Sequence, residues 1–437
     1  MDMEFSTVKP DDPKIRLEQL RNIKGSLGRR VSEARQAGNL SDGLMQEFRS
    51  VSAEIKTLQK LLKRQLKQAN GEERWAPPEI NPDCAILDRS VQGPLHVEVC
   101  DDRVLAAADA YVLGHPASSL WHRPVITAFI DQTYGHPTRM LGAFSDAGEF
   151  VGILALVQLK SRLFGNFIVS VPYFNYGGLL ADNRMVAEAL IDAANQWRHQ
   201  KSASHLELRH VRHLALELPQ RTNKLSFWLP LPKTASELWG SFKPKLRAQI
   251  RRGEREMVSF TLGGPEYLDD FYRVFSENMR DLGTPVYGRQ FFRDLMQYLP
   301  GQTWLVVVKL DRKAVGCAFL ARHRDRLEIP WASALRRVGH TGINMFMYWK
   351  ILEFAIGQGV KVFDFGRCTE NAGTYHFKKQ WGAHPIPLHW DYVLAAEQRL
   401  PGLNPENPRY RLLIEAWKRL PVWAANLLGP AIVRKLP

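Results

Sequence analysis

One stretch of sequence occurs twice and decides the fold. Phe150-Val-Gly-Ile-Leu-Ala-Leu-Val-Gln-Leu-Lys-Ser-Arg-Leu163 aligns with Ala314-Val-Gly-Cys-Ala-Phe-Leu-Ala-Arg-His-Arg-Asp-Arg-Leu327 at an offset of 164 residues. Both copies are apolar runs of strand length, which is typical of a buried strand. Recurrence at this distance indicates a duplicated domain, because the repeats of solenoid proteins are much shorter.

The segments around the two copies also correspond. A strand-like run precedes each copy, a helix-length segment follows it, and a short strand ends the unit: 138–144, 182–200 and His205–Arg209 in the first unit, 304–310, 341–358 and Val362–Gly366 in the second. This order predicts two α/β (α+β) domains with the same strand order, over 95–230 and 231–395. Leu229-Pro-Leu-Pro232 marks the boundary between them.

Residues 1–75 have a different pattern. Apolar residues recur at heptad spacing over 15–34 and 44–66, which predicts an antiparallel helical coiled-coil hairpin. Gly38 suits the stop of its first helix, and Ser41 or Asp42 the cap of its second. A proline-rich linker, 76–94, follows.

Two interpretations of this hairpin stay open. It is a spacer or dimerisation coil, since charged outer faces are usual on coiled coils. Alternatively it is a tRNA-binding arm, because its second helix ends in a basic run, Lys60, Lys63, Arg64 and Lys67.

The charge of the chain indicates a polyanionic partner. Lys and Arg number 59 against 45 Asp and Glu, a formal charge of +14. Nucleic acid, a phosphate-rich substrate and an acidic membrane face all fit. The basic excess lies in 1–75, 240–256 and the amphipathic tail 396–437, which we expect either to pack on the core or to lie on a membrane surface.

Several classes of site lack their signatures. The sequence contains no GxxxxGK[ST], HExxH or GxSxG motif, and none of its four cysteines forms a CxxC pair. We therefore predict no metal site and no tightly bound cofactor. Unpaired cysteines and an N-terminus without an apolar core favour a cytoplasmic protein, with peripheral attachment at the inner face of the cytoplasmic membrane as an open alternative.

The densest group of chemically useful residues follows the last repeated strand. Phe363-Asp-Phe-Gly-Arg367 leads into Gly373-Thr-Tyr-His-Phe-Lys-Lys-Gln-Trp-Gly382. Asp364 is expected at the carboxyl end of a strand, where α/β sheets place functional groups, although a lone Asp there also caps turns. The candidates that accompany it are Arg367, Tyr375, Lys378, Lys379 and Trp381. Lysine is seldom a core residue, so we expect Lys378 to be removable with little loss of stability.

A second candidate is the loop between the predicted strand 326–334 and the helix 341–358. Its residues Arg336, Arg337, Gly339 and Gly342 are a degenerate form of the RxxGxG/A loop with which GNAT acyltransferases hold a pyrophosphate. Glycines there let backbone N–H groups approach a phosphate at a helix N-terminus. The alternative is an ordinary glycine-rich turn.

Taken together, these motifs resemble the FemAB-like acyltransferases, which are tandem GNAT proteins, and within them the branch associated with the exosortase/PEP-CTERM system. The resemblance covers about residues 97–437 and rests on Lys160–Gly165, Tyr176-Gly-Gly178, Leu282–Val286, Asn344–Trp349, Phe363–Arg367, Thr374–Gly382 and Asn404–Pro421. Two departures stand out: Cys368 replaces the family's serine, and the hairpin at 1–75 is an addition.

The resemblance implies two tandem GNAT-like domains and N-acyl transfer, with acyl-CoA or aminoacyl-tRNA as co-substrate. The acceptor would be an amine on a cell-envelope or exopolysaccharide precursor, a nucleotide- or lipid-linked sugar. Lys378 matches the family's FKxxW lysine, expected on a phosphate, and Asp364 and Tyr375 would handle protons or orient groups. Tyr176 is expected to contact substrate. The alternative function is a non-catalytic assembly factor, membrane-peripheral or tRNA-binding, built on degenerate GNAT domains. The chain is also a candidate for homodimer formation.

The two interpretations of the hairpin can be separated by deletion. If the hairpin binds tRNA, a chain lacking 1–75 should lose its RNA gel shift while the remainder stays folded. An unchanged gel shift would leave only the spacer or dimer role.

Overall fold

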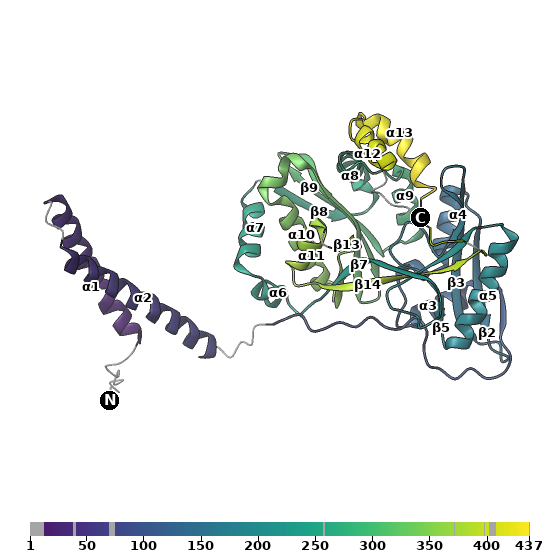
Figure 1. The fold of residues 1–437 in the computed structure, drawn as a ribbon, viewed down its shortest axis with the longest axis horizontal. Coiled ribbons are helices and arrows are strands. Elements are labelled where there is room, and N and C mark those ends of the chain that lie inside the picture. Colours follow the sequence, from purple (N-terminus) through teal and green to yellow (C-terminus); the bar gives the residue numbers. More distant parts are fainter. Residues whose placement is uncertain are drawn as a thin grey trace. The chain divides into compact units, whose positions relative to one another are not determined.

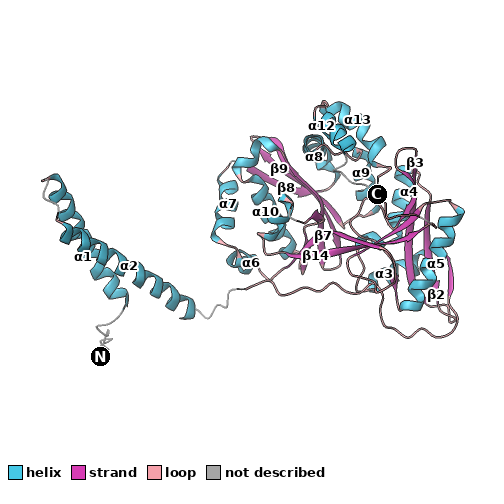
Figure 2. Ribbon diagram, in the orientation of Figure 1, coloured by secondary structure: helices cyan, strands magenta, loops and turns pink. Residues whose placement is uncertain are grey.

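The computed structural model describes residues 13–37, 41–69, 75–256, 258–370, 372–396, 398–401 and 408–436, with the side chains at 13–15, 60–61, 63–69 and 408–412 outside the description. The chain divides into two compact units, Met1–Trp75 and Ala76–Pro437. Figures 1 and 2 show a helical first unit and a second unit of sheet and helices.

The first unit is the predicted helical hairpin. Its helices are α1 (Pro13–Gln36) and α2 (Asp42–Ala69). Leu17 and Leu20 of α1 pack with Ile55 of α2. Arg16, at the start of α1, forms an ion pair with Glu54 of α2 at 3.0 Å, and Lys24, farther along α1, lies 5.5 Å from the ring centre of Phe48, earlier in α2. The helices are therefore antiparallel. The expected stop at Gly38 and the basic side chains Lys60, Lys63, Arg64 and Lys67 lie outside the described residues.

The second unit is built on one 14-stranded sheet within the described residues, in the order β1-β2-β3-β4-β6-β14-β7-β12-β11-β10-β9-β8, with β5 on β3 and β13 on β7. The strands are β1 (His96–Val99), β2 (Thr138–Phe144), β3 (Phe150–Ser161), β4 (Gly165–Val169), β5 (Leu180–Ala181), β6 (His205–His210), β7 (Gln220–Pro230), β8 (Val258–Gly263), β9 (Thr303–Leu310), β10 (Lys313–His323), β11 (Arg326–Ala334), β12 (Val362–Asp364), β13 (Cys368–Thr369) and β14 (His384–Leu394).

The α-helices described in the second unit are α3 (Leu105–Gly114), α4 (Pro124–Tyr134), α5 (Arg184–Gln200), α6 (Ala235–Ser241), α7 (Pro244–Arg255), α8 (Leu268–Leu282), α9 (Arg289–Tyr298), α10 (Ile343–Gly357), α11 (Gly373–Lys379), α12 (Pro408–Lys418) and α13 (Val422–Val433). Helices such as α5, α8 and α10 pack on the sheet, and α12 and α13 pack on α8. The repeated strands β3 and β10 are buried along nearly their whole length. Their continuous apolar runs follow from this, since strands that are covered on both faces do not alternate.

The predicted duplication is confirmed. The first half has the order β1-β2-β3-β4-β6 and the second β8-β9-β10-β11-β12. In each half a helix connects a parallel pair of strands, α5 between β4 and β6 and α10 between β11 and β12. The architecture is therefore two tandem GNAT-like domains.

The two halves exchange their last strands, which the sequence did not predict. β7 leaves the first half and pairs with β12 of the second, while β14 leaves the second half and pairs with β6 of the first. β7 and β14 pair with each other, antiparallel, in the middle of the sheet (Figure 2). One continuous sheet results, and neither half is complete without a strand from the other.

The predicted linker docks in part on this sheet. Ile86 forms a β-bridge to Ala181, and the N–H groups of Leu87 and Arg89 donate to the carbonyls of Ala181 and Asp182, each at 2.9 Å. Residues 86–89 therefore extend the first half, because their backbone groups find partners there.

The C-terminal tail packs on the core through α13. A Cβ at Gly429 would meet the backbone N of Val286 at 2.8 Å, so only glycine allows this approach. Tyr173 Oη and His136 Nε2 donate to the carbonyl of Arg434, at 2.6 and 2.7 Å. None of the helices in the described parts of the chain is both long enough and apolar enough to span a membrane.

Gly178 holds a packing constraint that can be tested. A Cβ at Gly178 would lie 2.1 Å from Nε2 of the buried His210, and His210 is fixed by Leu179 N–H and Asp391. Overpacking of this kind costs about 1–3 kcal/mol or more. We expect Gly178→Ala to lower the free energy of unfolding by at least that amount in urea titrations.

The matched control is Gly357→Ala, in the last turn of α10, where an added Cβ would meet nothing within 4 Å. It should raise the free energy of unfolding by up to about 0.5–1 kcal/mol. Equal stability changes for the two variants would contradict the packing at Gly178.

Candidate active site

The candidate residues gather at the point where the parallel strands β11 and β12 separate, which we call the strand fork. β11 and β12 pair in register over three positions, Arg326 with Val362, Leu327 with Phe363 and Glu328 with Asp364. β12 ends at Asp364, whereas β11 continues to Ala334. Ligands of α/β proteins commonly bind outside such carboxyl ends of parallel strands.

The carboxylate of Asp364 lies at this fork and is 0% exposed. It accepts hydrogen bonds from the Tyr176 hydroxyl, from Ser226 Oγ at 2.6 Å and from the Gly366 N–H at 2.8 Å. Burial raises the pKa of Asp364 to about 7, although the Gly366 hydrogen bond and the charge of Lys378 oppose the rise.

Lys378 is close enough to Asp364 for each charge to act on the other's pKa. Its Nζ donates to the carbonyls of Gly366 at 2.6 Å and Arg367 at 3.0 Å. The side chain is buried, so our expectation of a readily removable lysine was wrong: the turn after β12 supplies carbonyls that make an ammonium group tolerable in the interior. Burial lowers the pKa of Lys378 to about 8.

A second buried carboxylate, Glu328, was missed by the sequence analysis. It accepts from Trp121 Nε1 at 2.6 Å and from Asn175 Nδ2 at 2.8 Å, and burial raises its pKa. The sequence does mark Glu328 as a candidate, because an acidic residue within the apolar run Leu327-Glu-Ile329 is unusual. Its parallel pairing with Asp364 could not be read from that run alone.

Tyr176 is brought to the fork from the first half of the chain. Its ring is buried, and the guanidinium of Arg326 lies 5.6 Å from the centre of that ring and 4.8 Å from that of Trp228. Arg326 also donates to the carbonyl of Ser118 at 2.8 Å. The fork is thus closed on one face by residues from the first half.

Two arginines flank one tryptophan on the neighbouring strands. The guanidinium carbons of Arg209 and Arg367 lie 4.6 and 5.3 Å from the centre of the Trp390 ring. Arg209 is buried and pairs with Glu207 at 2.8 Å, but its Nη2 has no hydrogen-bond partner among the residues that the structure describes. Arg367 is partly exposed to solvent, but the loss of water around its guanidinium, together with the charge of Arg209, lowers its pKa to about 10. This pair suits an anionic ligand group.

The remaining candidates after β12 are held by contacts other than a hydrogen bond to Asp364 within the described residues. The Tyr375 ring packs edge-on against Phe227, and Lys379 lies over the same Tyr375 ring at 5.7 Å. Trp381 is buried in an aromatic cluster with Phe242, Tyr348, Phe365 and Phe377. The structure therefore places Trp381 in the core.

The loop before α10 forms a 3-10 helix, Arg336–Thr341, followed by Gly342. Arg336 donates to the carbonyl of Asp281 at 3.0 Å, and Arg337 forms an ion pair with Glu277 at 2.5 Å. A Cβ at Gly339 would meet nothing within 4 Å, whereas Gly342, at φ +81°, lies against Gln249 and Gly253 of α7. The basic helix α7 and this loop thus form one surface.

The chemistry available at the fork is proton exchange near neutral pH. The pKa values of Asp364 and Lys378 are displaced toward each other by burial, and such groups can give and take protons in catalysis. In the described parts of the chain, no three or more His, Cys, Asp or Glu side chains are grouped to hold a metal ion.

Comparison with known proteins supports the fold. The family described as an acetyltransferase (GNAT) domain matches residues 240–379, which include Asp364 and Lys378. The structure of FemX is similar with a TM-score of 0.56 at 14% identity, covering 73% of this chain and 100% of that chain. No curated protein sequence matches.

Two further solved structures show weaker similarity. L-PGS from Bacillus licheniformis has a TM-score of 0.47 at 15% identity, over 74% of this chain and 99% of that one. A tandem GNAT protein from the clavulanic acid biosynthesis pathway has a TM-score of 0.44 at 12% identity, over 70% of this chain and 100% of that one.

The raised pKa of Asp364 predicts a pH-dependent loss of stability. Above its ordinary pKa of 3.8 the unfolded chain has released this proton, while the folded protein keeps it up to about pH 7. Wild-type stability should therefore fall, relative to Asp364→Asn, as the pH rises through this window. A displacement of about three pH units corresponds to about 4 kcal/mol.

Urea unfolding of both proteins between about pH 4 and about pH 8 measures this difference. Asp325→Asn, at an exposed carboxylate ion-paired with Lys361, is the matched control. Parallel curves for wild type and Asp364→Asn would show that Asp364 titrates as an ordinary carboxylate.

Proposed function

We propose that this protein is an N-acyltransferase that moves an acyl or aminoacyl group from a thioester or a tRNA ester to an amine. One observation carries the proposal: Asp364 and Lys378, both with pKa values displaced toward neutrality, meet at the strand fork of the half that matches the GNAT acetyltransferase domain. Acyl transfer to an amine needs a group that accepts the amine's proton and a group that stabilises an oxyanion.

The two residues can divide these tasks. The Tyr176 hydroxyl donates to Asp364, so Tyr176 can accept a proton from the amine while passing its own to the carboxylate. The ammonium of Lys378, with two of its three N–H groups on carbonyls, has one left for the oxyanion of the tetrahedral intermediate. Collapse of the intermediate breaks the bond to the donor's sulfur or oxygen. The leaving thiolate or alkoxide then takes up the proton from Asp364 through Tyr176, which restores the ionised carboxylate.

The donor is expected to bind through its phosphates on the surface formed by α7 and the loop before α10. The exposed cations of α7, namely Lys245, Arg251, Arg252 and Arg255, have no ion pair among the described residues, and Gly253 of α7 contacts Gly342 of the loop. Both acyl-CoA and aminoacyl-tRNA carry phosphates that suit this surface.

The acceptor that fits best is an amine on a phosphate-bearing cell-envelope or exopolysaccharide precursor. Arg209 and Arg367 flank Trp390, and the buried Nη2 of Arg209 has no partner in the described parts of the chain, which favours binding of an anion there. The resemblance to the FemAB-like and PEP-CTERM-associated proteins supports a nucleotide- or lipid-linked sugar as the carrier of that anion.

Removing the Lys378 charge tests the mechanism. Lys378→Met keeps the apolar stem and should lower the transfer rate about 10²–10³-fold, because an oxyanion donor acts mainly in the transition state. The assay follows radiolabelled product from acetyl-CoA and from charged tRNA in parallel, with an amino-sugar nucleotide as acceptor, at a temperature where both proteins are folded.

Lys379→Met is the matched control, since Lys379 is the adjacent exposed lysine on α11 and should transfer at the wild-type rate. If Lys378→Met were as active as wild type while Asp364→Asn was inactive, the oxyanion would lie elsewhere. Absence of transfer from either donor by wild type would favour the non-catalytic alternative.

A further inference from the structure

Helix α13 has two faces of different kinds. Ala425, Gly429 and Val433, four residues apart, are buried on the core. Trp423 and Leu427 are 71% and 72% exposed on the other side. An exposed tryptophan and leucine one turn apart are unusual for a surface that faces only water.

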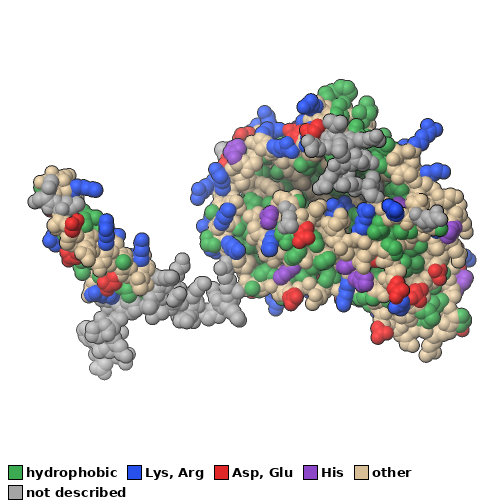
Figure 3. All heavy atoms as spheres, viewed as in Figure 1, with side chains coloured by type: hydrophobic (Ala, Val, Ile, Leu, Met, Phe, Trp, Pro, Cys, Tyr) green, Lys and Arg blue, Asp and Glu red, His purple; other side chains and the backbone are tan. Residues whose placement is uncertain are grey.

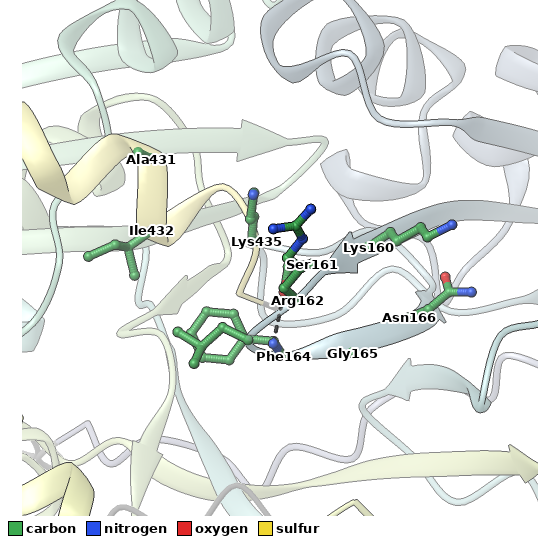
Figure 4. A pocket seen from close by; sticks show the side chains of 10 residues that line it. Lys160, Ser161, Arg162, Phe164, Gly165, Asn166, Ala431, Ile432 and Lys435 are labelled. Atoms are coloured by element: carbon green, nitrogen blue, oxygen red, sulfur yellow. Dashed lines mark hydrogen bonds between the residues drawn. The ribbon is translucent and has the colours of Figure 1, made fainter.

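A neighbouring turn extends this apolar surface. The turn between β3 and β4 carries Leu163, which is 75% exposed. It lines one cavity of about 680 Å³ together with Ile432 and Lys435 at the end of α13. Figure 4 shows Arg162 and Lys435 near one another at this cavity, with Phe164 below them in the view and Ile432 to the left.

Basic residues frame the apolar surface. Arg419, Arg434 and Lys435 flank α13, Lys160 lies near the end of β3, and Arg162 belongs to the turn. None of these five forms an ion pair within the described part of the chain. Residues 416–437 contain four basic residues and no acidic one. Figure 3 shows hydrophobic side chains gathered where α12 and α13 lie, with basic side chains nearby.

We propose that this surface, formed by α13 and the β3–β4 turn, binds an anionic phospholipid bilayer. The apolar side chains enter the interface between headgroups and acyl chains, where tryptophan is favoured, and the flanking cations meet lipid phosphates. A second copy of the chain fits less well, because a two-fold contact through this face would bring the two basic frames together.

This proposal is independent of the proposed function. Helix α13 would lie on the membrane and would not span it. The apolar face lies along the side of α13 while the opposite side stays on the core, so the helix would rest in the plane of the membrane. The enzyme could then reach acceptors carried on lipids, with its fold unchanged.

Sedimentation with vesicles tests the proposal on the full chain. The vesicles are phosphatidylcholine, either pure or with about 30% phosphatidylglycerol. We expect binding to the anionic vesicles and at least about tenfold weaker binding by Leu163→Glu with Leu427→Gln, because each leucine loses its apolar burial. Arg162→Glu with Lys435→Glu should lose the preference for anionic lipid.

Matched controls separate this surface from general basic attraction. Met185→Glu introduces an acid at an exposed apolar residue on α5, and Arg252→Glu with Arg255→Glu makes the same charge change on α7. Both should bind vesicles like wild type. Loss of binding by the α7 variant but not by the α13 variants would overturn the proposal.

Two other results would also overturn it. One is absence of wild-type binding to anionic vesicles. The other is a concentration-dependent dimer, seen by light scattering, that the α13 variants abolish, since the face would then be a contact between copies. Thermal melting of each variant confirms that a loss of binding is not a loss of fold.

Discussion

The pairing of β7 with β14 is the interaction on which the rest of the second unit depends. Each strand ends one half of the chain but completes the sheet of the other half, so the hydrogen bonds between them close a single sheet. This exchange places corresponding residues of the two halves in matching positions: Asp364 opposite Trp228 on β7, and Glu207 opposite Tyr392 on β14. It also brings Ser226 of β7 to the Asp364 carboxylate.

The first half has an equivalent fork, where the parallel strands β4 and β6 separate beside Glu207, and it differs in charge from the fork of β11 and β12. Glu207 is neutralised by Arg209 at 2.8 Å and accepts from Tyr392 Oη at 2.9 Å. The hydrogen-bond donors to Asp364 in the described structure are neutral. Because none of them supplies a positive charge to offset burial, burial raises the pKa of Asp364. A duplicated fold has thus produced one fork that suits anion binding and one that suits proton transfer. The buried lysine at the second fork gives it an opposite charge that titrates in the same pH range.

Sequence periodicity predicted the helices and strands well, because the pattern of apolar residues within each segment indicates its secondary structure. The hairpin, the duplicated strand order and the position of Asp364 at a strand end all followed from local pattern. The exchange of β7 and β14 could not be predicted in this way, because the sequence of a strand does not determine which strand it pairs with. For the same reason Glu328 was missed and Lys378 was expected to be removable. Trp381, chosen for its motif, lies in the core, whereas the partnerless Nη2 of Arg209 is visible only in three dimensions.

The central claim is that Asp364 and Lys378 form the acyl-transfer centre, and the pH dependence of the transfer rate tests it most directly. With Asp364 ionised and Lys378 protonated in the active form, kcat/KM should be bell-shaped, with limbs near the pKa values of about 7 and about 8. Asp364→Asn should abolish the acid limb and Lys378→Met the alkaline limb. A profile that follows only the pKa of the acceptor amine, unchanged in both variants, would contradict the account.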